Sequence, residues 1–327
     1  MAVLTDRFGR VFPYLRLSVI EACNFSCSYC LPDGYQARPD LPVPLRLDEI
    51  RRLLHAFAAV GMRKVRLTGG EPSLRKDLTE IIRIAADTPG VGTVAMTTNG
   101  SLLRKRLGDW KSAGLTALNV SVDALDSARF ARITGHDRLD ELLLGIDEAL
   151  DAGLRQVKLN AVLLRGLNDD QLPAWLAYLR DRPVGLRFIE LMQTGCNLNY
   201  FKQHHYRAEV LETELRALGW SAQPRAADAG PAIDYAHPGY AGRIGIIAPY
   251  AKDFCTGCNR LRVTASGDLR LCLFGNTGTA LRPLLQSDDQ SDLLQARLLG
   301  QLGVKAAGHG LHSGQTGLIP HLASIGG

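Results

Sequence analysis

Six short apolar segments, each followed by a stretch with helical spacing, recur over the first two thirds of the chain. These segments are residues 15–20, 64–68, 93–97, 117–122, 157–164 and 185–191. Short and nearly continuous apolar runs are typical of parallel strands that are buried on both faces. Six strand–helix units in series predict an α/β fold with a parallel barrel, and six units rather than eight predict a barrel that stays open on one side.

Helical spacing fills the intervals between these segments. Ile50, Leu53, Leu54 and Phe57 recur at i, i+3, i+4 and i+7, which is the stripe expected on one face of an amphipathic helix. Later helices are predicted over roughly residues 76–87, 102–113, 139–152 and 170–181.

A change in composition near residue 220 predicts a second part of the chain. Residues 223–238 are rich in Ala, Asp, Gly and Pro and are expected to form a loop or linker. Beyond them we expect one strand and then the two arms of a β-hairpin, at residues 243–247, 260–265 and 269–274. We therefore expect a partial (β/α)6 TIM-type barrel over residues 1–220 and a C-terminal extension over residues 221–327.

Three cysteines lie in one short loop after the first predicted strand: Cys23, Cys27 and Cys30, with the spacing C-x3-C-x2-C. Clustered thiolates suit an iron–sulfur cluster, and a four-iron cube held by three cysteines keeps one iron open to a small molecule. Structural zinc is the alternative, but zinc prefers four closed ligands and no histidine lies within twenty residues of Cys30. A disulfide would leave one thiol over and is typical of secreted chains.

A second cysteine group, Cys255, Cys258 and Cys272, has the spacing C-x2-C-x13-C, and Cys272 is expected on the second arm of the hairpin. Three thiolates again suit a cluster, while a zinc knuckle completed by His237 or by an aspartate is the alternative. Cys196 is left over, and we expect it to be a buried thiol without a chemical role.

Cations accompany the second cysteine group and the barrel strands. Arg260 and Arg262 alternate on one predicted strand, so both side chains should lie on the same face, and Arg270 comes shortly before Cys272. Guanidinium groups bind phosphate with two hydrogen bonds at once. Cations buried in a barrel are costly unless an anion neutralises them. The barrel strands carry Arg16, Lys64, Arg66, Lys158 and Arg187. Together these residues predict a polyanionic ligand in the mouth of the barrel.

Polar residues collect where the six predicted strands end. In parallel barrels this rim carries ligands and catalysis. Besides the first cysteine loop, the rim has residues 68–72 (TGGEP), 97–100 (TTNG), Ser121, Asp123, Glu190 and Met192.

Charge and composition narrow the class of partner. The net charge of +5 comes without a long Lys/Arg run, which is below what a nucleic-acid-binding domain usually shows. No apolar run approaches the roughly 20 residues of a membrane helix, and the first residues have no apolar signal segment. We expect a cytoplasmic protein that binds neither nucleic acid nor membrane, as a monomer or homodimer.

With the cysteine loop, the Gly69-Gly70-Glu71-Pro72 turn and the six-strand pattern together, the sequence resembles the radical S-adenosylmethionine (SAM) enzymes. The second cysteine group, the Arg-x-Arg after it and the terminal Ile325-Gly326-Gly327 resemble one family among them, the GTP 3′,8-cyclases of molybdenum-cofactor (molybdopterin) biosynthesis. The resemblance covers about residues 15–274 and the last three. Where that family usually has Thr-Asp-Arg before the first cysteine, this chain has Ile20-Glu21-Ala22, and residues 308–321 are rich in Gly and His rather than Lys and Arg.

The resemblance implies a role for each matching residue. The first cysteine group would hold a 4Fe–4S cluster whose open iron takes SAM, and the second group a 4Fe–4S cluster whose open iron meets guanine. SAM is implied to contact Tyr29, Gly70, Ser121 and Met192. GTP is implied to contact Arg16, Arg66, Thr97, Lys158, Arg260, Leu261 and Arg262, of which Arg16, Arg260 and Arg262 are also implied to be catalytic. The Gly-Gly tail is implied to reach back into the active site.

The implied activity is that of a lyase that takes one electron from an external donor. Cleavage of SAM gives methionine and a 5′-deoxyadenosyl radical, which takes hydrogen from C3′ of GTP. The C3′ radical then attacks C8, which forms the new ring on the way to 3′,8-cyclo-7,8-dihydro-GTP. The protein's part is to hold C3′ near the radical and to exclude water. Two other interpretations stay open: another radical SAM enzyme with an auxiliary cluster, such as a peptide maturase, and a zinc-dependent nucleic-acid-binding module.

Overall fold

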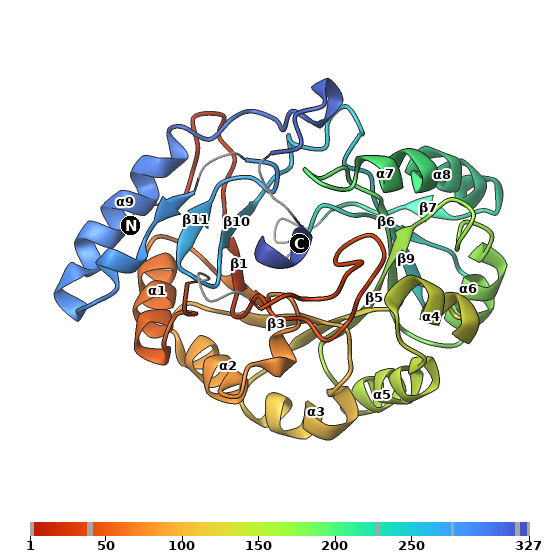
Figure 1. The fold of residues 1–327 in the computed structure, drawn as a ribbon, viewed down its shortest axis with the longest axis horizontal. Helices are drawn as coiled ribbons and strands as arrows, with labels where there is room; N and C mark the ends of the chain where they lie inside the picture. Colours follow the sequence, from red (N-terminus) through yellow and green to blue (C-terminus); the bar gives the residue numbers. More distant parts are fainter. Residues whose placement is uncertain (1–2, 38–41, 226–228, 276–277, 318–320, 326–327) are drawn as a thin grey trace.

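The computed structural model of the chain describes residues 3–37, 42–225, 229–275, 278–317 and 321–325. Within these residues, one twelve-stranded sheet curves around a central space, and helices cover its outer side (Figure 1). Eight neighbouring strands of this sheet run parallel, and short antiparallel strands extend it at both edges. The predicted open barrel is confirmed.

The six central strands follow the chain order across the sheet. They are β1 (Tyr14–Ser18), β2 (Lys64–Thr68), β3 (Thr93–Thr98), β4 (Ala117–Ser121), β5 (Gln156–Leu163) and β6 (Gly185–Glu190). The sequence predicted each of them to within two residues at either end. Their apolar side chains are almost fully buried, for example Leu17, Val65 and Leu118, which is why near-continuous apolar runs marked them.

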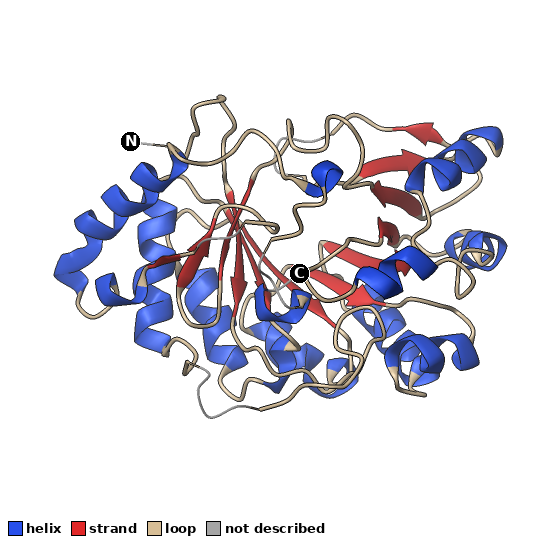
Figure 2. Ribbon diagram, turned by 45° about the horizontal axis from the view of Figure 1, so that its top comes forward, coloured by secondary structure: helices blue, strands red, loops and turns tan. Residues whose placement is uncertain are grey.

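Helices pack against the outer face of these strands (Figure 2). The predicted ones are α1 (Leu47–Ala59), α2 (Leu78–Asp87), α3 (Leu103–Ser112), α5 (Leu139–Asp151) and α6 (Leu172–Leu179). In α1 the expected stripe is the buried face, since Ile50 and Phe57 are at most 1% exposed. One helix that the sequence analysis did not predict, α4 (Ser127–Thr134), begins where the Asp126 side chain accepts a hydrogen bond from the amide of Arg129.

Strands from the C-terminal third complete the parallel sheet. β9 (Arg243–Ile247) pairs with β6, and β10 (Arg260–Val263) pairs with β1, which places Arg16 opposite Arg262. β10 and β11 (Asp268–Arg270) form the predicted hairpin, but β11 ends at Arg270. Cys272 therefore lies beyond the second arm and not on it, contrary to expectation.

The sheet edges contain strands that the sequence analysis did not predict. They are β7 (Ser221–Ala222), β8 (Ile233–Ala236) and β12 (Thr279–Ala280). The expectation that residues 223–238 form only loop or linker is wrong, because β8 pairs with β9 inside this stretch. Tyr235 of β8 is fully buried, and this single anchor outweighs the turn-prone composition around it.

Further helices flank the C-terminal segments. They are α7 (Leu198–His204), α8 (Ala208–Ala217) and α9 (Ser291–Leu302), with short 3-10 helices at Pro72–Leu74, Arg282–Leu284, Asp288–Gln290, Leu311–Ser313 and Leu322–Ile325. The last of these places the end of the described chain inside the ring of strands (Figures 1 and 2). Gly326 and Gly327 lie outside the described residues. Among those described, no helix combines the length and apolarity that crossing a bilayer requires.

Candidate active site

The first cysteine loop leaves β1 and folds directly over the glycines that follow β2. The amide of Gly70 donates to the carbonyl of Ile20 at 2.9 Å, and the amide of Glu71 donates to that of Ala22 at 2.8 Å. A Cβ on Gly70 would lie 2.3 Å from the carbonyl oxygens of Glu21 and Ala22. The glycine is therefore needed because any side chain would push the two loops apart.

The three thiols of this loop lie close enough to influence one another. Burial and then the neighbouring thiol of Cys23 raise the pKa of Cys30 to about 12, and burial also raises the pKa of Cys27 and of Cys23. Backbone amides of Leu322 and Ala323 donate to the Cys30 sulfur, which brings the C-terminal tail onto the loop. Three partly buried thiols with raised pKa values become thiolates most readily when a metal cation compensates their charge.

A buried carboxylate fastens this loop to the barrel. Glu71 is 1% exposed and accepts three hydrogen bonds, from the amide of Ser73 (2.9 Å), from Oγ1 of Thr98 (2.6 Å) and from the amide of Asn99 (2.6 Å). The side chain of Asn99 in turn donates to that of Asn24 in the cysteine loop at 2.9 Å. The GGEP and TTNG segments thus form one network behind the first cysteine group.

The residues predicted to bind SAM come from different strand ends on this rim. Tyr29 donates its hydroxyl to Asp123 Oδ2 at 2.9 Å, and the other oxygen of Asp123 accepts from the amide of Val162 at 2.8 Å. Burial raises the pKa of Asp123 to about 6. Ser121 ends β4, and Met192 follows β6 and lines the central cavity.

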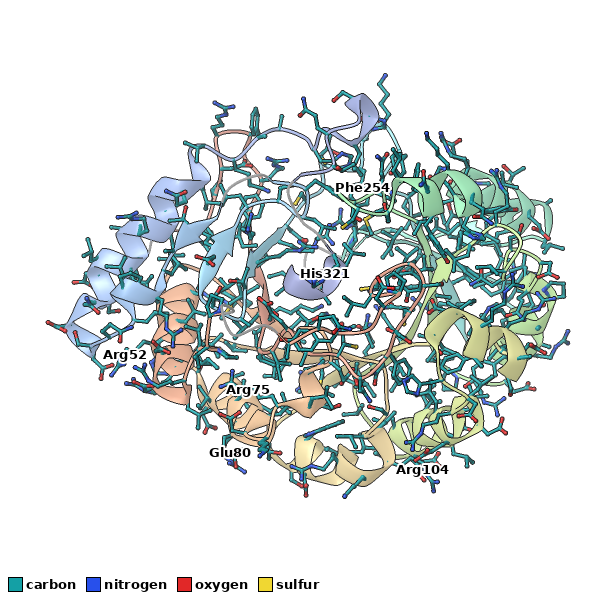
Figure 3. All side chains as sticks on the ribbon, in the orientation of Figure 1. Arg52, Arg75, Glu80, Arg104, Phe254 and His321 are labelled. Carbon is teal, nitrogen blue, oxygen red and sulfur yellow. The ribbon has the colours of Figure 1, made fainter. Side chains whose placement is uncertain are left out.

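A cavity of about 460 Å³ occupies the inside of the barrel. Cations dominate its described wall, where Asp234 is the only carboxylate. Phe254 and the three cysteines of the second group form part of the same wall. Figure 3 shows Phe254 at one side of the ring of strands and His321 inside this ring. The lining cations are Arg16, Lys64, Arg66, Arg155, Lys158, Arg187, Arg225, Arg243, Arg260 and Arg262.

Several of these cations are buried in a wall whose described residues include one carboxylate, that of Asp234. The Nε atoms of Arg187, Arg260 and Arg262 are buried and have no hydrogen-bond partner among the described residues. Burial and then neighbouring arginines lower the pKa of Arg262 to about 9, and burial with the charge of Arg187 lowers that of Lys158 to about 7. Such a set is costly unless an anion enters, so the cavity is built for a polyanion.

Tyr14 belongs to this cationic cluster and was missed by the sequence analysis. Its hydroxyl accepts from Nε of Arg66, whose terminal nitrogen donates to Thr97 Oγ1 at 3.2 Å. Burial alone would raise the pKa of Tyr14, but the charges of Arg66, Arg16 and Lys64 bring it down to about 6. The signal was available, since Tyr14 stands two residues before Arg16 and must share its face of β1.

The structure also tests what the sequence analysis expected of Leu261, Cys196 and His237. The side chain of Leu261 is 1% exposed and belongs to the core, so GTP could meet only its backbone. Cys196 is exposed, and the expectation that it is buried is wrong, because it lies in the loop between β6 and α7. His237 packs its ring against Trp220 and Tyr240.

The donor sets of both cysteine groups fit 4Fe–4S clusters. All seven cysteines are free of disulfides. In the second group, burial would raise the pKa of Cys258, but the charges of Lys305 and then Arg260 bring it below its usual value, which favours the thiolate. Among the described residues, no three His, Cys, Asp or Glu side chains converge as one metal ion would require. A cube distributes its thiolates over separate irons.

Two family models match successive parts of the chain. The model of the Radical SAM superfamily matches residues 17–179, and the model described as Molybdenum Cofactor Synthesis C matches residues 184–311. The crystal structure of Streptococcus suis SuiB bound to S-adenosylmethionine has the same fold, with a TM-score of 0.62 at 14% identity over 90% of this chain and 68% of SuiB. Fold and cysteine loop together define a radical SAM enzyme.

Curated relatives then give the particular family. A GTP 3′,8-cyclase of Stenotrophomonas maltophilia (strain R551-3) is 66% identical over the whole of both chains. One of Aeromonas hydrophila subsp. hydrophila is 55% identical over 100% of this chain and 97% of its own. The chain belongs to the GTP 3′,8-cyclase family, whose members are radical SAM lyases with two 4Fe–4S clusters. The zinc interpretation of the cysteine groups is thereby set aside.

Proposed function

We propose that this chain converts GTP to 3′,8-cyclo-7,8-dihydro-GTP in molybdenum-cofactor biosynthesis, with the side chains of its own cavity in the roles that follow. One observation carries the proposal. A single cavity combines a wall of ten cationic side chains with the three cysteines of the second group. A triphosphate matches the cations, and a nucleobase can reach a metal cluster held by the cysteines.

The triphosphate is proposed to bind the cations of β10, β1 and β2, which are neighbours in the sheet, and of β5, which lies further along it. Arg260 and Arg262 each offer an Nε that has no hydrogen-bond partner within the described part of the chain, and the register of β10 with β1 sets Arg16 beside Arg262. Arg66 is held by Tyr14 and Thr97, so it is oriented before the ligand arrives. Lys158 supplies a further charge from β5. We propose that Arg16, Arg260 and Arg262 also position the ribose for reaction.

The SAM site is proposed at the rim, next to the first cysteine loop. Cys23, Cys27 and Cys30 would hold the first cluster, and Tyr29, Gly70, Ser121 and Met192 would contact SAM. When bound, the first cluster and SAM supply the radical that removes hydrogen from C3′ of GTP. The tail contacts Cys30 through Leu322 and Ala323, and it covers the rim from inside the ring of strands. We infer that it excludes water during the reaction.

Cys255, Cys258 and Cys272 are proposed as ligands of the second cluster, where guanine would bind. They line the cavity together with Arg260 and Arg262, so a base at the cluster would leave its phosphates toward the cations. We also propose that residues 1–220 form the radical SAM barrel and residues 221–327 the part with the second cluster. An external one-electron donor, a cytoplasmic location without nucleic-acid or membrane partners, and a monomeric or homodimeric state complete the proposal.

An anaerobic product assay tests it. Reconstituted protein with GTP, SAM and a reductant should give 5′-deoxyadenosine and 3′,8-cyclo-7,8-dihydro-GTP in equal amounts by mass spectrometry. Iron and sulfide analysis should return two 4Fe–4S clusters, and Cys258→Ser should remove one of them. Protein that carries both clusters but forms no deoxyadenosine with GTP would refute the proposal.

A further inference from the structure

Two buried cations hold the second cysteine group from outside the substrate cavity. Neither Lys305 nor Arg10 lines that cavity, and the roles proposed above use neither of them. We propose that Lys305 is a positioning residue for the second cluster, whose ammonium both fixes the segment before Cys272 and compensates the cysteine thiolates. This inference rests on the assignment of Cys255, Cys258 and Cys272 to that cluster.

The geometry of Lys305 is unusual for a lysine. The residue lies three positions after the end of α9, where its amide donates to the carbonyl of Leu302, and it is only 4% exposed. Its Nζ donates to the carbonyl of Leu271, the residue before Cys272, and lies 5.2 Å from the ring centroid of Phe12. Lysines are almost never buried to this degree unless a negative group compensates them.

The negative groups near Lys305 are the cysteines. Burial lowers the pKa of Lys305, and the charges that oppose this effect belong to Cys258 and Cys272. The ammonium of Lys305 also binds the carbonyl of Leu271, next to Cys272, so a buried cation lies directly behind this cysteine. This is the arrangement expected behind a cluster with negatively charged ligands.

Arg10 ties the same segment to the other side of the cysteine group. Its guanidinium donates to the carbonyls of Ala306 (2.7 Å), Ala307 (2.6 Å) and Cys255 (3.0 Å). Asp6 pairs with Arg10 at 2.6 Å, and these two side chains are 0% and 8% exposed. The segment after α9 is thus held between the loops of Cys255 and Cys272, so the ammonium has a defined position relative to both.

A positive charge at this place has a definite redox consequence. Reduction adds an electron to the cluster, and a nearby cation stabilises the reduced state more than the oxidised state. Replacing Lys305 by an uncharged residue should therefore lower the potential of the second cluster. Replacing it by arginine should keep the charge and most of the effect.

The test uses the full chain with Cys23, Cys27 and Cys30 changed to Ser, so that the second cluster alone remains. Lys305→Met, Lys305→Gln and Lys305→Arg are compared with Lys252→Met, which removes an exposed lysine near Cys255. Redox titration is followed by electron paramagnetic resonance. We expect Lys305→Met and Lys305→Gln to raise the oxidised-to-reduced ratio at fixed potential at least tenfold, which is about 59 mV for a one-electron couple. Lys305→Arg should stay within about threefold, and Lys252→Met should change nothing.

Lys305→Gln separates charge from folding, because its amide can still donate to the carbonyl of Leu271. If circular dichroism shows that Lys305→Met does not fold, the potential of the second cluster in Lys305→Gln alone tests the inference. A potential unchanged in Lys305→Gln would overturn the inference. Failure of the underlying assignment looks different: the background protein would hold no four-iron cluster, or Cys258→Ser in that background would leave its iron content unchanged.

Discussion

Binding of GTP should be accompanied by proton uptake, because two side chains of the cavity in the free protein, Lys158 and Tyr14, are mostly deprotonated at pH 8, whereas a bound triphosphate favours their protonated forms. Lys158 has its pKa lowered to about 7 by burial and by the charge of Arg187, so it is mostly neutral at pH 8. Tyr14 has its pKa lowered to about 6 by the surrounding cations against the effect of burial, so it is mostly ionised there. A bound polyphosphate favours the ammonium and disfavours the phenolate, and both groups then gain a proton.

The size of the effect follows from the pKa of Lys158. In the free protein the ammonium form of Lys158 predominates below pH 7 and is lost as the pH rises through that value, whereas bound GTP raises the pKa of Lys158 in the complex. Between pH 7 and 9 the affinity for GTP should therefore fall by up to tenfold per pH unit from Lys158 alone, or ~1.4 kcal/mol. At pH 8 the terminal phosphate, with a second pKa near ~6, is already ionised and adds little.

Calorimetry at pH 8 in two buffers of different ionisation enthalpy measures the protons taken up by the anaerobic holoenzyme. We expect between about one and two protons per GTP for the parent. Lys158→Met should take up about one proton fewer, whereas Lys202→Met, which removes an exposed lysine of α7, should match the parent. A binding enthalpy that does not depend on the buffer, or an uptake unchanged in Lys158→Met, would refute the reasoning.

Three further changes test other parts of the site. Arg260→Ala combined with Arg262→Ala removes two charge-assisted hydrogen-bonding groups, so the rate of cyclisation should fall at least ~100-fold while the first cluster still assembles. Near-normal product formation would contradict the proposal that these two arginines bind the phosphates. Asp123→Asn weakens the support of Tyr29, and the apparent KM for SAM should rise about tenfold, with an unchanged KM as the contrary result. Glu71→Gln places a side-chain amide where the carboxylate accepts three hydrogen bonds, at a cost of ~1–3 kcal/mol in the free energy of unfolding. The Tm of the apo protein should fall by roughly 2–6 °C. An unaltered Tm would show that this network does not stabilise the fold.

The sequence predicted the barrel well because its strands are buried on both faces. Burial on both faces is sufficient to explain short apolar runs such as residues 64–68. The ends of the predicted strands differ from those in the structure by two residues at most. Edge strands have no such signal. β8 carries one fully buried tyrosine among Asp, Ala and Ile, and its pairing with β9 is decided by contacts far along the chain.

The cavity could be anticipated from alternation, and its supports could not. Arg260 and Arg262 were placed on a common face because side chains two positions apart on a strand point the same way. Lys305 and Arg10 give no pattern of this kind, since each acts on carbonyls more than thirty positions away. Such long-range contacts become visible only when the fold has brought the segments together.

The register of β1 with β10 joins the beginning of the chain to its last quarter, and this has a consequence for biosynthesis on the ribosome. Until residues 260–263 emerge, the nascent barrel has an open edge at β1, with its basic residues exposed to solvent and to stray nucleotides. The first cysteine loop is then already complete, whereas the second still lacks a member. The three ligands of the first group therefore leave the ribosome together, long before those of the second group, and β10 closes the edge at β1 only after most of the barrel has been made.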